Sequence, residues 1–569
     1  MKNLKMLILL SIVLQALSSM ACTGETLYNG IVLPDEWPPR TYEMTREPMP
    51  VPYLENPPED IPIDVGRQLF VDDFLIETTT LQRTFHQPEY CEQNPVIKPD
   101  KPWENQRRGW FAAPFSGGAW FDPADNLFKM WYTGGFLATT CYATSKDGIH
   151  WEKPELDVNK GTNIVVEPTN NGYKYFDTNT IWLDHNAKDP GEKFKYFATE
   201  WENAYWRMVY RVSADGVHWS KYKLRPLIWG DRTTAFHNPF RDVWILSQRI
   251  GGEPVGRARS YLEAPTAMDL MEAVTPNESP KVNDVEIPVA QGWSVLWTNA
   301  DDLDPRHADP KYAESAPELY NLDAAPYESL MIGYFSIWQG PSNEECGELK
   351  LQKRNDILLG FSRDGFHWDR PCRERFISCT WDEENWRYGN VQSVASGCLV
   401  VGDKLYFYFS GRAKPREGSK SWDADAATGL AILRRDGFAS MDAGPNTETL
   451  TTRPVTFKGK HLFVNVDCPK GELKVEVLDK DGEVIEPFTL ANCEPVSSDK
   501  TLVQVNWREG KDLAALANKP VRFRFQLTNG SLYSFWVSPD TSGASHGYVG
   551  AGGPGFKGPK DTVGQIAYR

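Results

Sequence analysis

The chain has 569 residues, of which 41% are hydrophobic and 12% aromatic, and its formal net charge is −16. A chain of this length and apolar content can bury more than one core, which excludes a disordered or fibrous protein. The acidic balance, without any basic run, excludes a nucleic-acid-binding surface and gives no reason to expect binding to anionic membranes.

Residues 1–21 have the pattern of an export signal. Two lysines precede the apolar run 6–17, which is too short to span a bilayer as a helix. Residues 19–22 read Ser-Met-Ala-Cys and resemble a bacterial lipobox, in which Cys22 is lipidated. Ordinary cleavage is the alternative, because Ser19 stands where an aliphatic residue is usual. We expect an exported protein, periplasmic or on the cell surface, that meets a membrane only through this lipid.

The next segment, residues 22–60, is rich in proline and predicts an extended tether ahead of the fold. Order is expected to begin at the apolar run 69–76. This run predicts a strand that helps to close a ring of sheets by joining a terminal blade.

One short phrase recurs along the chain. It reads Ser-x-Asp-Gly-x-His-Trp at 145–151, 213–219 and 362–368, and degenerate copies stand at 257–261 and 435–438. Asp-Gly supplies the positive φ angles of a tight hairpin turn, and the trailing Trp is large enough to wedge between neighbouring sheets.

A strand rich in aromatic residues precedes each of the five copies, at 128–132, 194–198, 243–247, 330–335 and 405–409. Repeating units of this size that consist only of strands favour closure into a ring. The sequence therefore predicts an all-β fold with a five-bladed β-propeller over residues 61–445.

The sequence pattern changes after the last copy of the repeated phrase. Residues 446–540 alternate short apolar strands with Asp-Gly and Asn-Gly turns, which predicts a β-sandwich. Cys468 and Cys493 lie in this part, as a disulfide or as buried free thiols. Residues 541–569 carry many glycines and few apolar side chains, and they predict a flexible tail.

A substrate site is expected at the mouth of the propeller, because the innermost strand of each blade starts there and the second strand ends there. Carboxylates, arginines and aromatic rings at one mouth suit a sugar, whose hydroxyl groups need polar partners and whose ring has an apolar face. The substrate-binding side chains selected in this way are Trp110, Glu200, Asp231, His237, Arg249, Trp338, Asn390 and Arg412.

Cleavage of a glycosidic bond needs one carboxyl group that protonates the leaving oxygen and a second that acts as nucleophile or base. Asp177 and Glu318 are the predicted catalytic pair. Glu318 takes the acid role because its apolar neighbours would keep it protonated. Glu200 and Asp231 are the reserves. The alternative for each carboxylate is structural, as a turn cap or as the partner of an arginine.

No metal site is predicted from the histidines. His150, His218 and His367 each belong to a different copy of the repeated turn, so they cannot bind the same ion. His237 is the only histidine expected in the funnel. No cofactor is predicted, and a structural Ca²⁺ is the alternative left open.

The repeated phrases resemble hairpins of the five-bladed propeller glycosidases, the superfamily of invertases, levanases, arabinanases and xylosidases. Residues 69–73, 238–241 and 533–536 resemble landmarks of secreted invertase-like proteins from polysaccharide-degrading bacteria. The resemblance implies a carbohydrate-active enzyme. The motifs W-x-N-D-P-N-G, R-D-P and E-C of invertase-like enzymes are not intact here, so neither fructan specificity nor catalytic residues carry over.

The functional hypothesis is an exported glycoside hydrolase that acts on fragments of plant or algal polysaccharide. A lyase or dehydratase of uronic acid residues, with His237 and Tyr388 as base and acid, is the first alternative. A non-catalytic glycan-binding lipoprotein and a phosphorylase are the others. The substrate partner is an oligosaccharide or polysaccharide in each case.

Overall fold

The computed structural model describes residues 24–568 apart from 41–43, 107–108, 168–174, 203–204, 229, 253, 275–280, 283–284, 287–293, 350, 417–423 and 509–511. The predicted export signal and Cys22 lie outside the described residues. Within those ranges, none of the helices combines the length and apolar character that crossing a bilayer requires. The helices are α2 (Pro52–Glu55), α3 (Ala267–Ala273) and α4 (Asn343–Leu349).

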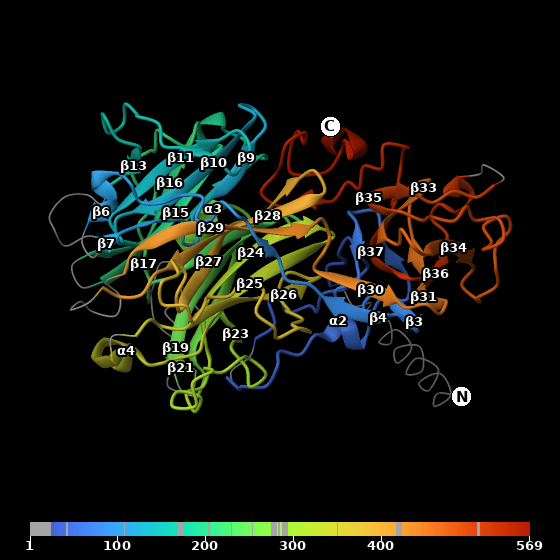
Figure 1. The fold of residues 1–569 in the computed structure, drawn as a ribbon, viewed down its shortest axis with the longest axis horizontal. Helices are drawn as coiled ribbons and strands as arrows, with labels where there is room; N and C mark the ends of the chain where they lie inside the picture. Colours follow the sequence, from blue (N-terminus) through green and yellow to red (C-terminus); the bar gives the residue numbers. More distant parts are fainter. Residues whose placement is uncertain are drawn as a thin grey trace, which may run out of the picture.

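Three sheets follow one another along the first half of the chain (Figure 1). The first contains β8 (Ala112–Ala113), β9 (Ala119–Asp122), β10 (Leu127–Gly134), β11 (Thr139–Ser145), β12 (Trp151–Glu152) and β13 (Ile164–Val166). The second contains β14 (Tyr175–Leu183), β15 (Phe194–Glu202), β16 (Tyr205–Ser213) and β17 (Leu227–Ile228). The third contains β18 (Thr234–Asn238), β19 (Val243–Gly252), β20 (Gly256–Ala264) and β23 (Val295–Asn299).

A fourth, eight-stranded sheet runs in the order β38-β24-β25-β26-β27-β28-β29-β5. Its strands are β38 (Tyr548–Val549), β24 (Glu318–Glu328), β25 (Leu330–Trp338), β26 (Asn355–Ser362), β27 (Asn390–Val401), β28 (Lys404–Arg412), β29 (Ala426–Arg434) and β5 (Glu89–Tyr90). A single parallel residue pair, Asn355 with Asn390, joins β26 to β27. The sheet therefore consists of two antiparallel halves held together at one point.

Two further sheets share a core at the other end of the molecule, on the right of Figure 1. One contains β2 (Gln68–Leu69), β4 (Gln82–Phe85), β30 (Ala439–Ala443), β33 (His461–Asp467), β35 (Asp499–Gln504) and β37 (Gly530–Ser538). The other contains β3 (Ile76–Thr79), β31 (Glu448–Thr452), β34 (Glu472–Leu478) and β36 (Arg522–Thr528). Cys468 and Cys493 are buried free thiols in this region.

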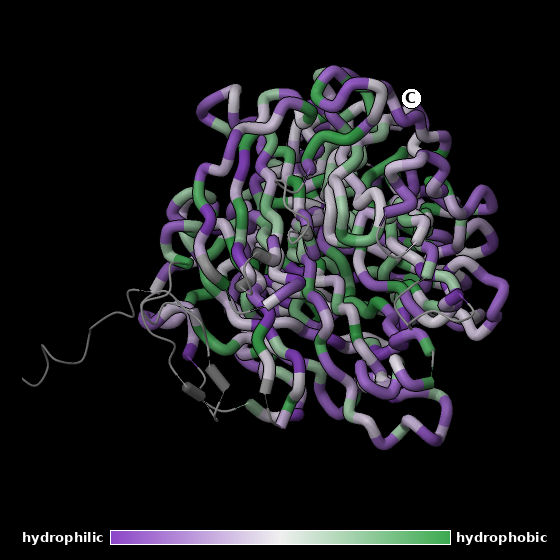
Figure 2. The backbone as a smooth tube through the Cα atoms, turned by 90° about the vertical axis from the view of Figure 1, so that its left-hand side faces the viewer, coloured by the Kyte–Doolittle hydropathy of each residue, from purple (hydrophilic) through white to green (hydrophobic). Residues whose placement is uncertain are grey.

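Short pairs complete the strands: β1 (Ile61–Pro62) with β32 (Val455–Thr456), β6 (Asn105–Gln106) with β7 (Gly109–Trp110), and β21 (Lys281–Val282) with β22 (Val285–Glu286). In Figure 2 hydrophilic stretches run along the outer loops, while hydrophobic stretches lie mostly in the interior strands. The largest core cluster spans the first three sheets and part of the fourth.

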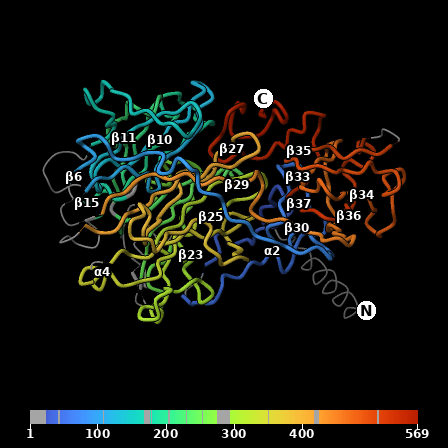
Figure 3. Tube along the Cα trace, in the orientation of Figure 1, coloured from blue at the N-terminus to red at the C-terminus, as the bar shows by residue number. Residues whose placement is uncertain are grey.

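The N-terminal strands differ from the expectation that residues 69–76 close a ring of sheets. β2, β3 and β4 belong to the C-terminal sheets, as the blue trace among orange strands shows in Figure 3. Phe70 stacks on Phe535 with centroids 5.7 Å apart, inside the core of those sheets. The later strand β5 pairs with β29 instead. The apolar run is shared between two cores: Leu69 and Val71 pack in the core of the fourth sheet, while Phe70 and Phe74 pack in the core of the C-terminal sheets.

The described part of the predicted tether, residues 24–60, is also packed. Tyr28 stacks on Phe240 with centroids 4.5 Å apart, and Trp37 Nε1 donates to Glu263. Leu27 and Tyr53 join the core of the C-terminal sheets. Apolar side chains between the prolines anchor this segment, whereas the proline content alone suggested a free spacer.

The C-terminal segment, expected to be a flexible tail, packs onto the fourth sheet. Val549, Phe556 and Val563 enter its core. Its glycines allow close backbone approach, because a Cβ at Gly553 would stand 1.7 Å from the Val400 carbonyl oxygen. The glycines of this segment therefore serve tight packing. A high glycine content is also typical of disordered chains, so composition alone does not tell the two apart.

The repeated turns have one geometry in all three full copies. In the first copy, Asp147 Oδ1 accepts the backbone N–H groups of residues 149 and 150, and Oδ2 lies 2.7 Å from His150 Nδ1. The same contacts recur at His218 and His367. These histidines therefore serve their own turns, as the sequence predicts.

The turns also connect neighbouring sheets. Trp131 Nε1 on β10 donates to the Gly216 carbonyl at 2.7 Å, and Trp297 Nε1 on β23 donates to the Phe366 carbonyl at 2.8 Å. Tyr408 on β28 donates to the Gly148 carbonyl at 2.5 Å, which connects the end of the repeat series to its first turn. The contact between neighbouring sheets therefore includes an aromatic side chain that donates a hydrogen bond to a turn of the adjacent sheet, in addition to the trailing Trp of the repeat.

Replacing Tyr408 by phenylalanine should cost about 1 kcal/mol of unfolding free energy, because a buried donor to Gly148 is lost. Tyr406→Phe on the same strand is the control, since the Tyr406 hydroxyl has no hydrogen bond among the described residues. Denaturant unfolding measures both variants. Equal stabilities would show that the turn contact contributes nothing to closure.

Candidate active site

Two acidic residues meet where inner strands begin. Asp177 lies near the start of β14, in a stretch where the register with β15 is irregular, and Asp231 directly precedes β18. Arg232 Nη1 is 3.7 Å from Asp177 Oδ1, and Arg249 Nη1 is 3.0 Å from Asp231 Oδ1. Arg232 has φ of 56°, a region that non-glycine residues rarely occupy and that is common at functional sites.

The surroundings of Asp177 favour its protonated form. Burial and the nearby Asp231 carboxylate raise the pKa of Asp177 to about 6, against the opposing charges of Arg232, Arg412 and Lys353. Its side chain is 14% exposed, which leaves a face that a ligand can reach. A carboxyl group protonated at mildly acidic pH beside a second carboxylate is the arrangement that acid catalysis requires.

Aromatic rings and cations surround this pair. The Arg232 guanidinium lies 4.4 Å from the Phe115 ring centroid and 5.5 Å from that of Tyr320. Arg412 lies 5.3 Å from the Phe115 ring, and Lys353 Nζ is 5.5 Å from the Tyr320 ring. Burial raises the pKa of the Tyr320 phenol, but the charges of Lys353 and Arg232 outweigh it, so the pKa falls below its usual value.

Sequence reasoning missed Phe115, Tyr320 and Lys353. Phe115 lies between β8 and β9, and Lys353 lies in the loop between β25 and β26. A search limited to strand starts and strand ends does not reach these loops. Tyr320 is the third residue of β24, and its position beside Glu318 was the one available signal.

Glu318 has a different environment from Asp177. Its Oε2 lies 2.8 Å from Arg257 Nη1 and accepts the Arg257 backbone N–H at 3.2 Å. The Arg257 guanidinium is 4.1 Å from the Trp338 ring centroid. Glu318 and Trp338 line a cleft of about 300 Å³. Among the described residues no ion pair joins Glu318 to the Asp177 cluster, and it has the arginine partner that the structural alternative predicts.

Glu200 is 1% exposed and accepts from Tyr222 at 2.9 Å and from Arg225 at 2.9 Å. Glu200 therefore has the structural role, as the partner of an arginine, that the sequence analysis gave as the alternative for each carboxylate. Trp110 is anchored through its backbone N–H, which donates to Asp425 at 3.1 Å. Asn390 lies opposite Arg412 in the β27–β28 register and is 1% exposed.

His237 departs from the expected position in the funnel. It is the fourth residue of β18, and its Nε2 is 3.2 Å from Asp242 in the turn that follows the strand. Asp231 lies three residues before the first residue of β18, whereas His237 lies one residue before the last. Burial lowers the pKa of His237. The strand carries this histidine to the opposite end of the sheet, because the expected start of β18 was placed too late.

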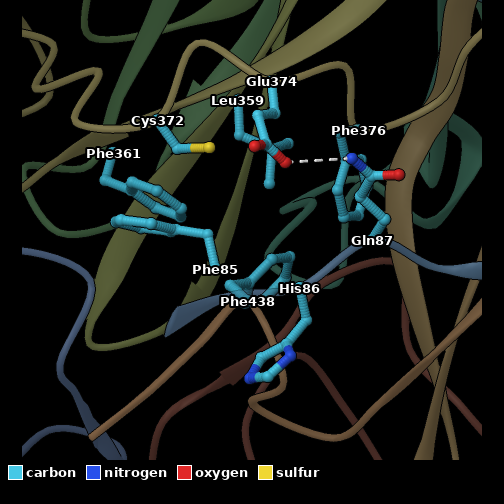
Figure 4. Close-up of a pocket in the computed structure, with 9 residues that line it drawn as sticks. All are labelled: Phe85, His86, Gln87, Leu359, Phe361, Cys372, Glu374, Phe376 and Phe438. Atoms are coloured by element: carbon cyan, nitrogen blue, oxygen red, sulfur yellow. Dashed lines mark hydrogen bonds between the residues drawn. The ribbon is translucent and has the colours of Figure 1, made fainter. Parts of the chain in front are cut away.

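The described residues hold no group of three or more His, Cys, Asp and Glu side chains that could bind a metal ion. Another pocket, between the fourth sheet and β4, is of a different kind (Figure 4). Phenylalanines 85, 361, 376 and 438 dominate its lining, and its polar edge is a 3.3 Å hydrogen bond from Gln87 to Glu374. His86 also lines this pocket, and its Nε2 lies 2.8 Å from Ser440 Oγ.

A scan of protein-family models gives no match for this chain, and neither does a search of curated proteins. The solved structures that it resembles include glycoside hydrolases. One is a fructofuranosidase from Schwanniomyces occidentalis complexed with fructosylnystose, with 11% identity, coverage of 79% of this chain and 98% of that chain, and a TM-score of 0.35. Another is a β-fructofuranosidase from Bombyx mori, with 10% identity, coverage of 80% and 94%, and a TM-score of 0.35.

A third comes from work on the GH130 family of mannoside phosphorylases, whose glycoside hydrolases target β-1,2 mannosidic linkages in Candida mannan. It has 15% identity, coverage of 63% of this chain and 97% of that chain, and a TM-score of 0.37. All three TM-scores are below 0.5, so the function has to follow from this chain's own side chains.

Proposed function

We propose that the protein is a glycoside hydrolase with Asp177 and Asp231 as its two catalytic carboxyl groups. The observation that carries this proposal is the buried Asp177, whose pKa is raised to about 6 beside the Asp231–Arg249 ion pair. One carboxyl group stays protonated up to a pH of about 6, and the other forms an ion pair with an arginine.

The proposed architecture is a five-bladed β-propeller followed by a β-sandwich. The first three sheets supply three blades, and the halves of the fourth sheet supply two more, since one residue pair joins them. The contact from Tyr408 to the first turn supports closure of this ring. The two C-terminal sheets with a common core support the sandwich.

In the proposed reaction, Asp177 gives its proton to the glycosidic oxygen as the bond to the anomeric carbon breaks. Asp231 attacks the anomeric carbon or takes a proton from the attacking water. Water supplies the hydroxyl group of the new reducing end and the proton that restores Asp177. Asp177 is thus the acid, the role that the sequence analysis gave to Glu318.

The proposed substrates are fragments of plant or algal polysaccharide that the protein meets after export. The signal-like residues 1–21 and the resemblance to secreted invertase-like proteins support this proposal. Lipidation at Cys22 would keep the enzyme at a membrane surface, and mass spectrometry of the mature N-terminus distinguishes it from ordinary cleavage.

The test is release of reducing ends from a panel of plant and algal oligosaccharides. The wild-type protein should cleave at least one of them, and Asp231→Asn should lose about a thousand-fold in kcat, because the amide cannot act as nucleophile or base. Glu318→Gln serves as the matched comparison. Activity that survives in D231N but disappears in E318Q would put Glu318 in the place of Asp231.

A second candidate is elimination from a uronic acid residue, and Tyr320 favours it. Its ring lies beside Arg232 and Lys353 and its pKa is lowered, whereas His237, the base expected from the sequence with Tyr388 as acid, pairs with Asp242 after β18. Elimination produces an unsaturated sugar that absorbs ultraviolet light, and Tyr320→Phe should abolish that product. Binding without any product over the whole panel would indicate a glycan-binding protein, and a strict need for phosphate would indicate phosphorolysis.

A further inference from the structure

Lys353 stands out among the cations of the candidate site. It lies in the loop before β26 and is half-buried. Its Nζ is 5.5 Å from the centroid of the Tyr320 ring and 5.4 Å from that of Trp338. Two aromatic faces attract the ammonium group and restrict its side chain, so the charge is held in one place before any ligand arrives.

Three neighbouring arginines already have carboxylate partners. Arg249 pairs with Asp231 at 3.0 Å, Arg257 with Glu318 at 2.8 Å, and Arg232 is 3.7 Å from Asp177. For Lys353 no carboxylate of the described residues lies within 4.0 Å; its contacts are the two rings. A half-buried ammonium group with no carboxylate within 4.0 Å can form a close ion pair with an incoming anion.

A second polar group at this position has no partner. Trp338 is 4% exposed, and its Nε1–H makes no hydrogen bond among the described residues. Opposite it in the β25–β26 register is Asn355, two residues from Lys353, whose side-chain amide is fully buried and equally unpartnered. Donors without acceptors therefore gather where Lys353 meets the end of β25.

Lys353 is also close to the reacting groups. Its Nζ and the Arg232 guanidinium each lie 5.5 Å from the centroid of the Tyr320 ring, and Arg232 Nη1 is 3.7 Å from Asp177 Oδ1. An anionic group bound to Lys353 would therefore belong to the same sugar that meets Asp177, or to its direct neighbour.

We propose that Lys353 determines specificity by binding the oxyanion of an acidic sugar, a uronate carboxylate or a sulfate ester, beside the catalytic pair. The inference rests on the proposed function in one respect, namely that the substrate binds beside Asp177 and Asp231. It adds the substrate class, acidic glycans, which neither the fold nor the pair of carboxyl groups specifies.

Binding separates this inference from hydrolysis. Proteins that all carry Asp177→Asn are titrated calorimetrically with trimers of galacturonate, mannuronate and guluronate, with the methyl esters of the same trimers, and with sulfated galactose oligosaccharides. Inorganic phosphate and sulfate are titrated alone. The site variants are Lys353→Met and Lys353→Arg. The matched control is Lys560→Met, because Lys560 is likewise half-buried and lies 4.7 Å from the Tyr548 ring, in the C-terminal segment.

At least one acidic trimer should bind at least ten-fold more tightly than its neutral counterpart. Lys353→Met should remove that preference, while Lys353→Arg and Lys560→Met should keep it. Preference for the uronate over its ester identifies a carboxylate, and preference for the sulfated oligosaccharide identifies a sulfate ester.

The proposal fails if neutral sugars bind as well as acidic ones, if Lys353→Met keeps the preference, or if no acidic oligosaccharide binds. Binding of free phosphate alone, lost in Lys353→Met, would also overturn it in favour of phosphorolysis. A Lys353-dependent preference without any hydrolysis by the wild-type protein would uphold this inference and reject the proposed function.

Discussion

Replacement of Asp177 by asparagine is expected to lower kcat by about a thousand-fold on any substrate that the wild-type protein hydrolyses, because the amide has no proton to give to the leaving oxygen. The shape and hydrogen-bonding capacity of the side chain are largely kept, so substrate affinity should change much less than kcat. Reducing-end release and calorimetric binding measure the two quantities separately.

The raised pKa of Asp177 determines the direction in which catalysis should change with pH. The pKa of Asp177 is raised to about 6, so the proton required for catalysis is present below that pH and absent above it. Wild-type kcat/KM should therefore fall as pH rises through about 6, while the residual activity of D177N should lack this limb. An unchanged limb in the variant would assign the titration to another group.

Stability provides an independent check on the same residue. A carboxyl group whose pKa is raised on folding destabilises the protein once pH passes its unfolded value, and the penalty is complete above the folded value. D177N should thus be more stable than wild type at pH 8, by on the order of 1 to 3 kcal/mol, and should lose this advantage near pH 4. A variant that is inactive yet more stable cannot be dismissed as misfolded.

The second large effect is expected at Asp436, in the degenerate copy of the repeated turn. Asp436 is fully buried and accepts from Arg67 at 2.9 Å, from Tyr327 at 2.6 Å and from Ser534 at 2.7 Å. Arg435, its neighbour, reaches Asp561 at 3.1 Å. These groups come from the N-terminal segment, the fourth sheet, the C-terminal sheets and the C-terminal segment, so the network joins the two parts of the molecule.

Asp436→Asn should cost about 3 to 5 kcal/mol of unfolding free energy, because it leaves buried guanidinium charge without its carboxylate. Asparagine tolerates the φ of 62° at this position, so the change removes charge without adding backbone strain. Equilibrium unfolding in denaturant measures the loss. The control is Asp302→Asn, whose partner Arg306 is 3.6 Å away at the surface, and it should change stability by less than about 0.5 kcal/mol.

The pH dependence of this network has the opposite sign to that of Asp177. Burial raises the pKa of Asp436, but Arg67 and Arg435 outweigh it and lower the pKa to about 2. The contribution of Asp436 is complete above its ordinary pKa and is lost as pH falls towards 2. The difference between wild type and D436N should therefore shrink in acid. A loss below 1 kcal/mol at pH 7 would show that the network is not an important link.

Local patterns carried the successful parts of the sequence analysis. The repeated turns formed as predicted because the hydrogen bonds that shape them, such as those from the backbone N–H groups of residues 149 and 150 to Asp147, close within seven residues. The strands before each turn followed for the same reason. Asp177 lies near the start of β14, as predicted, because strand starts are a local property; its catalytic role stays a prediction.

The partners of these residues could not be predicted in the same way. Asp231 lies near Asp177 although 54 positions separate them, and Lys353 comes from a loop with no strand pattern. His237 lies at the far end of β18 because one strand boundary determines which mouth a side chain reaches. Each of these outcomes depends on where separate sheets come together. Local sequence patterns do not determine that arrangement.

The sequence by itself determined the high strand content and the hairpin turns, because these follow from short-range sterics and hydrogen bonding. Only the tertiary structure decided that the proline-rich and glycine-rich ends are packed, that Glu318 pairs with Arg257, and that Asp177 meets Asp231. Burial sets the pKa of Asp177, and burial exists only once distant segments have closed around it.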